Sequence, residues 1–366
     1  MSCFYPTPAA GLQTPSPPPT PEIPSTPRPR PGKLTITVAR RPPILLLLCG
    51  LLFAGQDCPA QTAPETAAPA VEFKPVAPRT YPRPAESWLE AQIALARHGF
   101  SCGPIDGVAG VQSATALRAF QESQNLPATG RLDDDTRAAL LLDTPPLTQL
   151  VLPADALADL QPLGKTWLEK SQQTTLAHEN ALELAAELTH SGHRFIAALN
   201  PSVNWNALTP GTVLSVPDVT PAPFPAKAAR LEIRLSGHVL QARDSQGRLL
   251  AHFPVSIARD VEKRPVGELH VISVIADPNY TFNPETFPES AEAQALGRKL
   301  ILAPGPNNPV GVAWIGLDRT GYGIHGTPTP EQVGRTESHG CFRLANWDAR
   351  TLLSLAWVGL PVTVLP

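Results

Sequence analysis

Residues 231–256 read LEIRLSGHVLQARDSQGRLLAHFPVS, and this stretch decides the class of the C-terminal fold. Leu231, Ile233 and Leu235 alternate with charged residues, which is the two-residue period of a strand that buries one face. A Ser-Gly pair and an Asp-Ser-Gln-Gly segment then separate this run from two further apolar runs. The stretch therefore predicts three antiparallel strands joined by tight turns.

Further strands are predicted downstream, at residues 269–275, 312–317 and 361–365. Together with the first three strands they favour a mainly β, sandwich-like domain over residues 229–366.

A long insertion, residues 277–309, interrupts these strands and contains Tyr280, Phe282 and Phe287 among several prolines. Long loops in compact domains are usually functional or act as lids. We therefore expect each of these aromatic residues, and Trp314, to be a packing residue, with a lid or groove that excludes water as the alternative.

The reactive side chains of this domain concentrate in two segments, YGIHGT at 322–327 and SHGCFR at 338–343. Cys341 lies beside His339 and two residues from Arg343, and His325 lies upstream. A thiol attacks only as the thiolate, and a neighbouring imidazole and guanidinium are expected to lower its pKa. This arrangement is the one that a cysteine acyltransferase requires.

Glycines adjoin both reactive residues. Gly340 allows a tight turn whose amides point at a developing oxyanion, and Gly326 lets a carbonyl approach the second nitrogen of the His325 imidazole. Two alternatives are an inert buried cysteine and a zinc site formed by His325, His339 and Cys341. No further cysteine and no carboxylate at tight spacing completes the zinc set, so neither a metal nor another cofactor is expected.

The chain has 366 residues, a formal net charge of −3 and 17% charged residues. This balance includes no basic excess, so a nucleic-acid partner is not expected. Its five cysteines are an odd number and too few for a disulfide framework. The hydrophobic content of 42% allows real cores, whereas the 44 prolines indicate segments that do not fold.

An export signal is predicted near the N-terminus. Residues 1–31 are rich in proline, serine and threonine, which is typical of disorder. Basic residues then precede an apolar run at 44–54 and a small-residue pattern that ends at Ala60. These features are typical of a secretory signal, and the run is too short to span a bilayer. We expect residues 1–60 to be a disordered tail and signal, with a buried helix of a cytosolic domain as the alternative.

Two further modules are predicted between this signal and the C-terminal domain. Residues 61–86 have the composition of a flexible linker, and residues 87–143 predict three short helices, the third capped by Asp133. Residues 165–219 are helical in pattern and end in a turn and a short strand, with no opening strand predicted before them. Cys102, in the three-helix module, is expected to be a structural thiol. The whole chain is thus predicted to be an α+β multidomain protein.

The residues of both N-terminal modules resemble known families. The three-helix module resembles the peptidoglycan-binding domain, and the segment WNALTPGTVLSVP at 205–217 resembles the second half of a lysin-motif sugar-binding module. The motifs that carry the first resemblance are GF at 99–100, GPIDG at 103–107, ALRAFQ at 116–121 and LPATGRLD at 126–133. The first resemblance implies binding to peptidoglycan, whereas glycan binding and a plain spacer remain open for the second segment.

The C-terminal domain resembles the L,D-transpeptidase catalytic domain. The motifs are FPVS at 253–256, APGPNNPVG at 303–311, GIHGTP at 323–328 and SHGCFRLANWD at 338–348. One departure is RPVG at 264–267, where the family often has Thr-Pro-Thr-Gly, and this puts a threonine contact there in doubt. The resemblance implies a cysteine enzyme of the bacterial cell wall that joins stem peptides or attaches other amines to them.

Roles for individual residues follow from this resemblance. Cys341 would be the nucleophile and His325 its general base, held by the carbonyl of Gly326. His339, Gly340 and the Cys341 amide would line the oxyanion site. Arg343 would either neutralise a substrate carboxylate or brace the cysteine turn. Substrate contacts are expected at Ser338, Tyr322, Trp314 and Asn308.

The resemblance implies a transpeptidase that works through a thioester. An L,D-carboxypeptidase or another cell-wall cysteine hydrolase with the same thiol is the alternative, followed by a catalytically silent wall-binding protein. The expected partner is peptidoglycan, through stem tetrapeptides and glycan strands. The chain is expected to be a monomer, without a transmembrane domain beyond a signal that could remain uncleaved, and to lie in the periplasm or at the cell wall.

Overall fold

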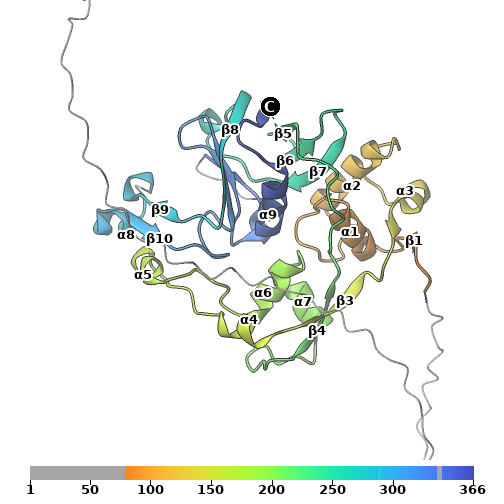
Figure 1. The fold of residues 1–366 in the computed structure, drawn as a ribbon, viewed down its shortest axis with the longest axis horizontal. Coiled ribbons are helices and arrows are strands. Elements are labelled where there is room, and N and C mark those ends of the chain that lie inside the picture. The colour runs from red at the N-terminus through yellow and green to blue at the C-terminus, as the bar shows by residue number, and fades with distance from the viewer. Residues whose placement is uncertain (1–78, 288, 336–339) are drawn as a thin grey trace, which may run out of the picture. The chain divides into compact units, whose positions relative to one another are not determined.

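The computed structural model describes residues 79–287, 289–335 and 340–366, so the predicted tail and signal at 1–60 lie outside the described residues. The C-terminal half is built on one eight-stranded sheet in the order β13-β12-β11-β8-β14-β5-β6-β7 (Figure 1). The strands are β5 Arg230–Arg234, β6 Val239–Arg243, β7 Leu249–Pro254, β8 Gly267–Ala276, β11 Ala313–Leu317, β12 Gly323–His325, β13 Phe342–Arg343 and β14 Pro361–Leu365.

The predicted strands of residues 231–256 are confirmed as β5, β6 and β7, paired antiparallel. Leu231 and Ile233 are fully buried, as their alternation with charged residues predicts. The strand predicted at the chain end is β14, which pairs parallel with β5 on one side and antiparallel with β8 on the other. The chain therefore returns to the middle of the sheet before it ends.

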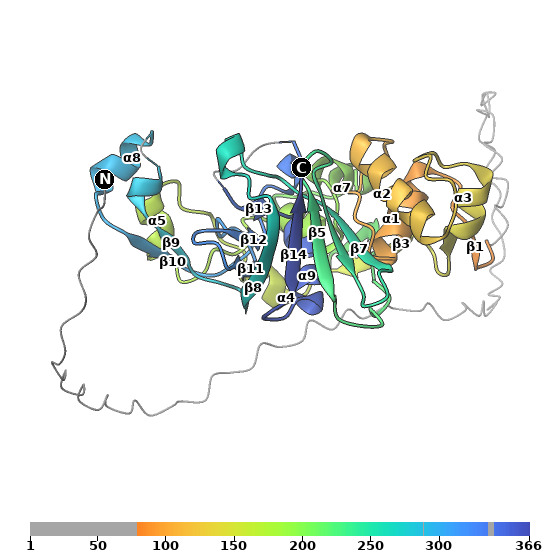
Figure 2. The same cartoon turned by 90° about the horizontal axis from the view of Figure 1, so that it is seen from above.

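The α+β class is confirmed, and the sandwich-like character comes from one long strand. Residues 267–270 of β8 pair with β14, and residues 271–276 pair with β11, so β8 belongs to both halves of a single sheet (Figure 2). Helix α9, Asn346–Leu355, packs on the sheet through Leu352 and Leu355, which are buried in the same core as Leu231. Each such leucine stabilises the fold by roughly 1.5–3 kcal/mol.

The insertion at 277–309 is ordered as a small subdomain. Strands β9, Tyr280–Phe282, and β10, Leu300–Leu302, pair antiparallel around η2, Pro284–Thr286, and α8, Ala291–Leu296. The Phe282 ring is fully buried and stacks on Trp167 of α5, Trp167–Gln172, with 4.5 Å between the ring centroids. Phe282 is therefore a packing residue, as predicted, and not a lid contact.

The three predicted helices of residues 87–143 are α1 Trp88–Arg97, α2 Val111–Ser123 and α3 Asp134–Ala139, beside the two-stranded pair β1 Arg83–Pro84 and β2 Leu141–Leu142. Asp133 caps α3 by accepting a hydrogen bond from the backbone N–H of Thr136, as predicted. Two buried glutamines organise the turns. The side chain of Gln92 accepts from the N–H of Gly107, and that of Gln121 accepts from the N–H of Gly130.

Residues 99–101 of this module lie along the outer edge of the sheet. The Ser101 N–H donates to the His252 carbonyl at 2.8 Å, and the His252 N–H donates to the Gly99 carbonyl at 3.0 Å. Strand β7 would otherwise present unpaired backbone groups, so this pairing covers a sheet edge that is open to aggregation. Figure 2 shows α1 and α2 beside β7.

The middle segment contains a strand that the sequence did not predict. Strand β3, Leu147–Val151, pairs antiparallel with β4, Val213–Pro217. Between these strands lie α4 Ala154–Ala158, α5, α6 Ala181–Leu188 and α7 His193–Leu199. The prediction that no strand opens this segment was therefore wrong. The strand was missed because α4 and α5 separate β3 from the rest of the module in the sequence. The 3₁₀ helices η1 Val261–Lys263 and η3 Pro330–Gln332 complete the described elements.

Across residues 79–287, 289–335 and 340–366, no helix combines the length and the apolar character that crossing a membrane demands.

A buried carboxyl group joins the three-helix module to α9. Asp348 is 3% exposed, and one of its carboxyl oxygens lies 2.9 Å from the Ser101 hydroxyl oxygen. Burial raises the pKa of Asp348 from 3.8 to about 8, and the hydrogen bond from Ser101 only partly offsets this rise. The carboxyl group is therefore protonated in the folded protein at neutral pH.

Replacing Asp348 with Asn is expected to remove a pH dependence of stability. The folded state keeps this proton up to about pH 8, whereas the ordinary pKa is 3.8. The free energy of unfolding of the wild type should therefore fall by about 1.4 kcal/mol per pH unit between these values, because the unfolded chain binds fewer protons. Denaturant unfolding of both proteins across this range measures the difference, and parallel profiles would contradict the protonated carboxyl.

Candidate active site

The register of β11, β12 and β13 brings the predicted reactive residues to one face of the sheet. Trp314 of β11 pairs with His325 of β12, and His325 pairs with Arg343 of β13. Paired residues share a face of the sheet, so Trp314, His325 and Arg343 do. Cys341 directly precedes β13, two residues before Arg343. Arg343 acts on the pKa of both Cys341 and His325, which places the three groups in one site.

The imidazole of His325 is held as a neutral acceptor. Its Nδ1 lies 2.6 Å from the Gly326 carbonyl oxygen, and because a carbonyl only accepts, Nδ1 carries the proton. The lone pair is thus on Nε2. Burial is the main cause that lowers the pKa of His325 to about 4, helped by Arg343 and opposed by the Gly326 carbonyl.

Trp314 supports this ring. The two ring centroids are 5.7 Å apart and the planes are inclined by 21°, so the indole stacks on the imidazole. A side chain at Gly323 or Gly316 would meet the indole, so these glycines make room for it on the sheet. Trp314 was predicted as a substrate contact, and the structure gives it a packing contact with His325.

The turn that supplies the Gly326 carbonyl rests on Asn346, which the sequence did not single out. Asn346 is 1% exposed, and its Oδ1 accepts from the Val312 N–H at 3.3 Å. Its Nδ2 donates to Glu187 Oε2 of α6 at 2.8 Å. A Cβ at Gly326 would collide with the Asn346 oxygen, so glycine is required there by this contact. Only the folded arrangement shows this requirement, because Asn346 and Glu187 are far apart in the sequence.

The thiol of Cys341 is half-buried and is not part of a disulfide. Its Sγ donates to the Gly321 carbonyl at 3.5 Å. Burial raises the pKa of Cys341, and the Gly323 amide and Arg343 lower it by less. The expectation of a lowered pKa was therefore wrong, because the cost of burying the anion exceeds the stabilisation that these two groups provide.

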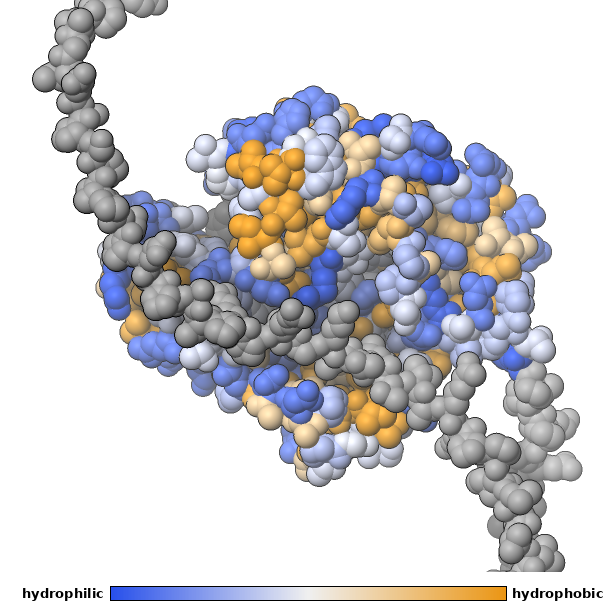
Figure 3. Space-filling model, viewed as in Figure 1, coloured by the Kyte–Doolittle hydropathy of each residue, from blue (hydrophilic) through white to orange (hydrophobic). Residues whose placement is uncertain are grey.

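Arg343 and Tyr280 complete the surroundings of the thiol. Burial lowers the pKa of Arg343, and both Cys341 and Tyr280 raise it. Burial raises the pKa of Tyr280, which is also raised by Cys341 and lowered by Arg343. The phenol on the first strand of the insertion is therefore close enough to the thiol to interact with it electrostatically. Two apolar residues of β8, Ile272 and Ile275, are exposed. Figure 3 shows hydrophobic side chains gathered in patches on the face of the molecule that it draws.

Other predicted contacts are placed differently. Asn308 is fully buried, and its side chain binds the backbone of Ala303 and Val310, so its predicted role as a substrate contact was wrong. Its side-chain amide is fully used in hydrogen bonds within and beside the insertion. The Tyr322 hydroxyl donates to the Lys263 carbonyl at 2.9 Å. A side chain at Gly340 would meet open space.

Ser338 and His339 lie outside the described residues. In the part of the chain that the structure describes, no three His, Cys, Asp or Glu side chains gather as a metal ion would require.

Comparison with known proteins identifies two domains. Residues 228–364 match the L,D-transpeptidase catalytic domain, the YkuD family, and residues 84–140 match a peptidoglycan binding domain.

Individual relatives match parts of the chain. The L,D-transpeptidase YkuD of Bacillus licheniformis is 24% identical over 189 residues, which are 51% of this chain and 94% of the relative. The L,D-transpeptidase YbiS of Escherichia coli is 28% identical over 213 residues, 54% of this chain and 65% of the relative. The crystal structure of an L,D-transpeptidase from Xylanimonas cellulosilytica aligns with 80% of this chain and 100% of its own, at 16% identity and a TM-score of 0.32.

Replacing Trp314 with Leu is expected to raise the pKa of His325 from about 4 toward 6.5, because the imidazole loses the ring that keeps water away. An NMR titration of the histidine resonances, assigned with a His325→Gln variant, measures the shift. Trp205→Leu is the control, because Trp205 packs in a different core cluster and should leave His325 unchanged. A pKa of His325 that stays near 4 in the Trp314 variant would show that the indole does not shield it.

Proposed function

We propose that this chain, whose residues 228–364 match the L,D-transpeptidase catalytic domain, cross-links peptidoglycan stem peptides through a thioester on Cys341. The observation that carries the proposal is the gathering of three groups in one site at the β12–β13 end of the sheet. These are the half-buried thiol of Cys341, the neutral imidazole of His325 with Nε2 unprotonated, and the guanidinium of Arg343. A nucleophile, a base and a cation in one site are the components of acyl transfer.

The first half of the reaction forms the acyl-enzyme. Sγ of Cys341 attacks the carbonyl of the L-configured centre of diaminopimelate in a donor tetrapeptide. Because burial raises the pKa of the thiol, Nε2 of His325 takes the proton as the C–S bond forms. The same proton then passes to the departing amine as the C–N bond breaks, so D-alanine leaves and a thioester remains.

The second half transfers the acyl group to an amine. The side-chain amine of a second stem peptide attacks the thioester carbonyl, and Nε2 of His325 takes its proton. The C–N bond forms and the thiol leaves with that proton. Water in place of the amine would give a tripeptide, which is the outcome of the hydrolase alternative.

Charge that develops on the substrate oxygen needs donors. We assign this role to the backbone around Gly340 and Cys341 together with His339, and we assign Arg343 to the stabilisation of nearby negative charge. Arg343 already lowers the pKa of Cys341 and so stabilises the thiolate, as a group that stabilises negative charge must. Tyr280 closes the site from the insertion side and limits access of water to the thioester.

The remaining modules would hold the enzyme on its polymer. Residues 84–140 match a peptidoglycan binding domain, and the βααβ arrangement of β3, α6, α7 and β4 is in line with the lysin-motif resemblance of residues 205–217. We propose that the first binds peptidoglycan and that the second contributes glycan contacts. Because this substrate lies outside the cytoplasm, we propose that the chain is exported and acts in the periplasm or at the cell wall, and that it acts as a monomer.

Replacing Cys341 with Ala is expected to abolish product formation from a disaccharide tetrapeptide, because no thioester forms. Cys102→Ala is the matched control, since Cys102 is the other free cysteine of the described residues and is buried. Intact mass spectrometry after acid quenching should find the acyl adduct in the wild type and the Cys102 variant. Muropeptide analysis should find dimers, whereas tripeptide alone would favour the hydrolase. An adduct that persists in the Cys341 variant would refute the mechanism.

The pH dependence of kcat/KM follows from the resting state, in which Cys341 is a thiol and His325 is a neutral imidazole. With the pKa of His325 lowered to about 4, the base stays unprotonated well below its ordinary pKa of 6.5. The acid limb of kcat/KM should therefore fall between about pH 4 and 5, with no loss of rate from pH 7 down to 6. Donor turnover measured across this range tests it. A tenfold fall in rate between pH 7 and 5.5 would mean that His325 titrates normally.

A further inference from the structure

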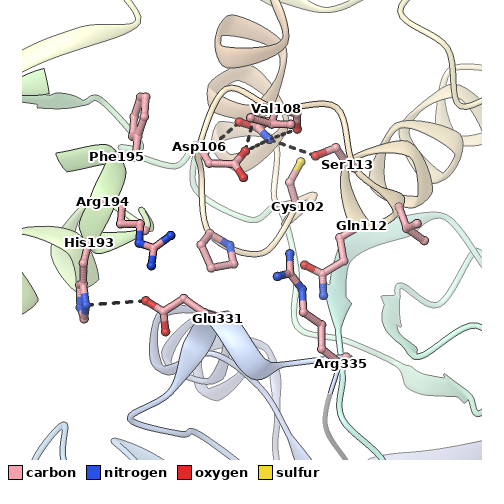
Figure 4. Close-up of a pocket in the computed structure, with 16 residues that line it drawn as sticks. Cys102, Asp106, Val108, Gln112, Ser113, His193, Arg194, Phe195, Glu331 and Arg335 are labelled. Carbon is pink, nitrogen blue, oxygen red and sulfur yellow. Dashed lines mark hydrogen bonds and ion pairs between the residues drawn. The ribbon is translucent and has the colours of Figure 1, made fainter. Parts of the chain in front are cut away.

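A cleft of about 910 Å³ lies where three parts of the chain meet. One wall comes from residues 102–113 of the three-helix module, a second from the first half of α7, and a third from residues 331–335 before the cysteine turn (Figure 4). We name this the three-module cleft. The mechanism proposed above makes no use of it.

Two guanidinium groups reach into the three-module cleft from different walls. Figure 4 shows Arg194 entering from α7 and Arg335 from the opposite wall, with Cys102 and Asp106 above them. Neither guanidinium makes a hydrogen bond or an ion pair with any residue of 79–287, 289–335 or 340–366. The nearby carboxylate of Glu331 lies 3.8 Å from Nδ1 of His193. Two unpaired cations across one cleft favour a ligand that carries carboxylates.

The rim of the three-module cleft is apolar. Val108 and Val111 are 62% and 84% exposed, and Phe195 lies across from them on α7. Exposed valines beside charged groups suit a ligand with methyl groups next to its carboxylates. A peptide built from alanine and dicarboxylic amino acids has this chemistry.

The three-module cleft is connected to the strand that follows the thiol. At the floor of the cleft, Nε2 of Gln112 donates a hydrogen bond to the Val333 carbonyl at 2.7 Å. This bond joins the three-helix module to the segment before the cysteine turn. The Gly334 N–H donates to Ser256 Oγ at 2.9 Å, and Ser256 exchanges two backbone hydrogen bonds with Arg343, at 2.9 and 3.0 Å. Ser256 therefore lies between the cleft and β13, on the edge of β13 that β12 leaves open. His325 and Trp314 lie on the β12 side.

We propose that the three-module cleft binds the acceptor stem peptide, with its carboxylates on Arg194 and Arg335 and its amine directed past Ser256 toward Cys341. This inference rests on the proposed function and adds the site of the second substrate. The donor occupies the face over His325 and Trp314, and the acceptor approaches from the opposite edge of β13. The three-helix module thereby contributes to the choice of acceptor as well as to attachment to the wall.

The test uses the full chain and an Arg194→Gln/Arg335→Gln double variant. The donor is a tetrapeptide whose side-chain amine is acetylated, so that it cannot also serve as acceptor. The acceptor is a stem tripeptide, L-Ala-γ-D-Glu-diaminopimelate, or the same tripeptide with its carboxylates amidated. We expect the KM of the wild type for the free-acid acceptor to be about tenfold below that for the amidated one, and the double variant to lose this preference.

Arg298→Gln is the matched control, because Arg298 is an exposed arginine that does not line the cleft, and it should keep the preference. Equal KM values for the free-acid acceptor in the wild type and the double variant would overturn the proposal. So would a rise in KM that is the same for both acceptors, since that would indicate damage to the fold.

A binding measurement separates this inference from the reaction. Titration of the free-acid tripeptide into the Cys341→Ala chain, followed by calorimetry, should give a Kd that rises about tenfold when the two arginines are also replaced. Absence of D-alanine release in the wild type would refute the proposed function alone. An unchanged Kd would refute the acceptor site alone, whatever the activity.

Discussion

The parallel pairing of the two-residue strand β13 with β12 is the constraint on which the site depends. Its register sets His325 opposite Arg343 and brings Cys341, which directly precedes β13, into the same site, although η3 lies between the two segments in the sequence. A shift of one residue would turn Arg343 to the opposite face of the sheet, away from His325. On the other edge of β13, two backbone hydrogen bonds join Ser256 to Arg343. The strand is therefore held in this register along both of its edges.

The modules around the sheet also stabilise the sheet and the active site through direct contacts. Residues 99–101 complete the edge of β7, and Glu187 of α6 binds Asn346, whose amide oxygen lies against Gly326. Removing the three-helix module would uncover a sheet edge and the buried carboxyl of Asp348. Loss of the Glu187 contact would loosen the turn whose carbonyl fixes the tautomer of His325. Binding and catalysis therefore share structural elements in this chain.

The sequence predicted those features that local chemistry determines. The alternation in residues 231–256 predicted β5 to β7, the acidic start of α3 predicted the cap at Asp133, and the glycine after His325 predicted the carbonyl contact at Nδ1. Features that depend on distant residues were not predictable in this way. Strand β3 finds its partner β4 across four intervening helices, and Asn308 looked available because its burial depends on the folded insertion. The raised pKa of Cys341 likewise comes from burial, which neighbouring residues in the sequence do not show.

Burial explains why the resting site contains a neutral pair instead of a thiolate and an imidazolium. Charging either group in a dry site costs free energy, and this cost raises the pKa of Cys341 and lowers that of His325. The Gly323 amide and Arg343 are nevertheless arranged to favour an anion on sulfur. Their stabilisation becomes useful when the proton has moved to Nε2 and negative charge passes from sulfur to the substrate oxygen. The same burial that keeps the thiol unreactive at rest therefore strengthens the electrostatic contacts that act on the transition state.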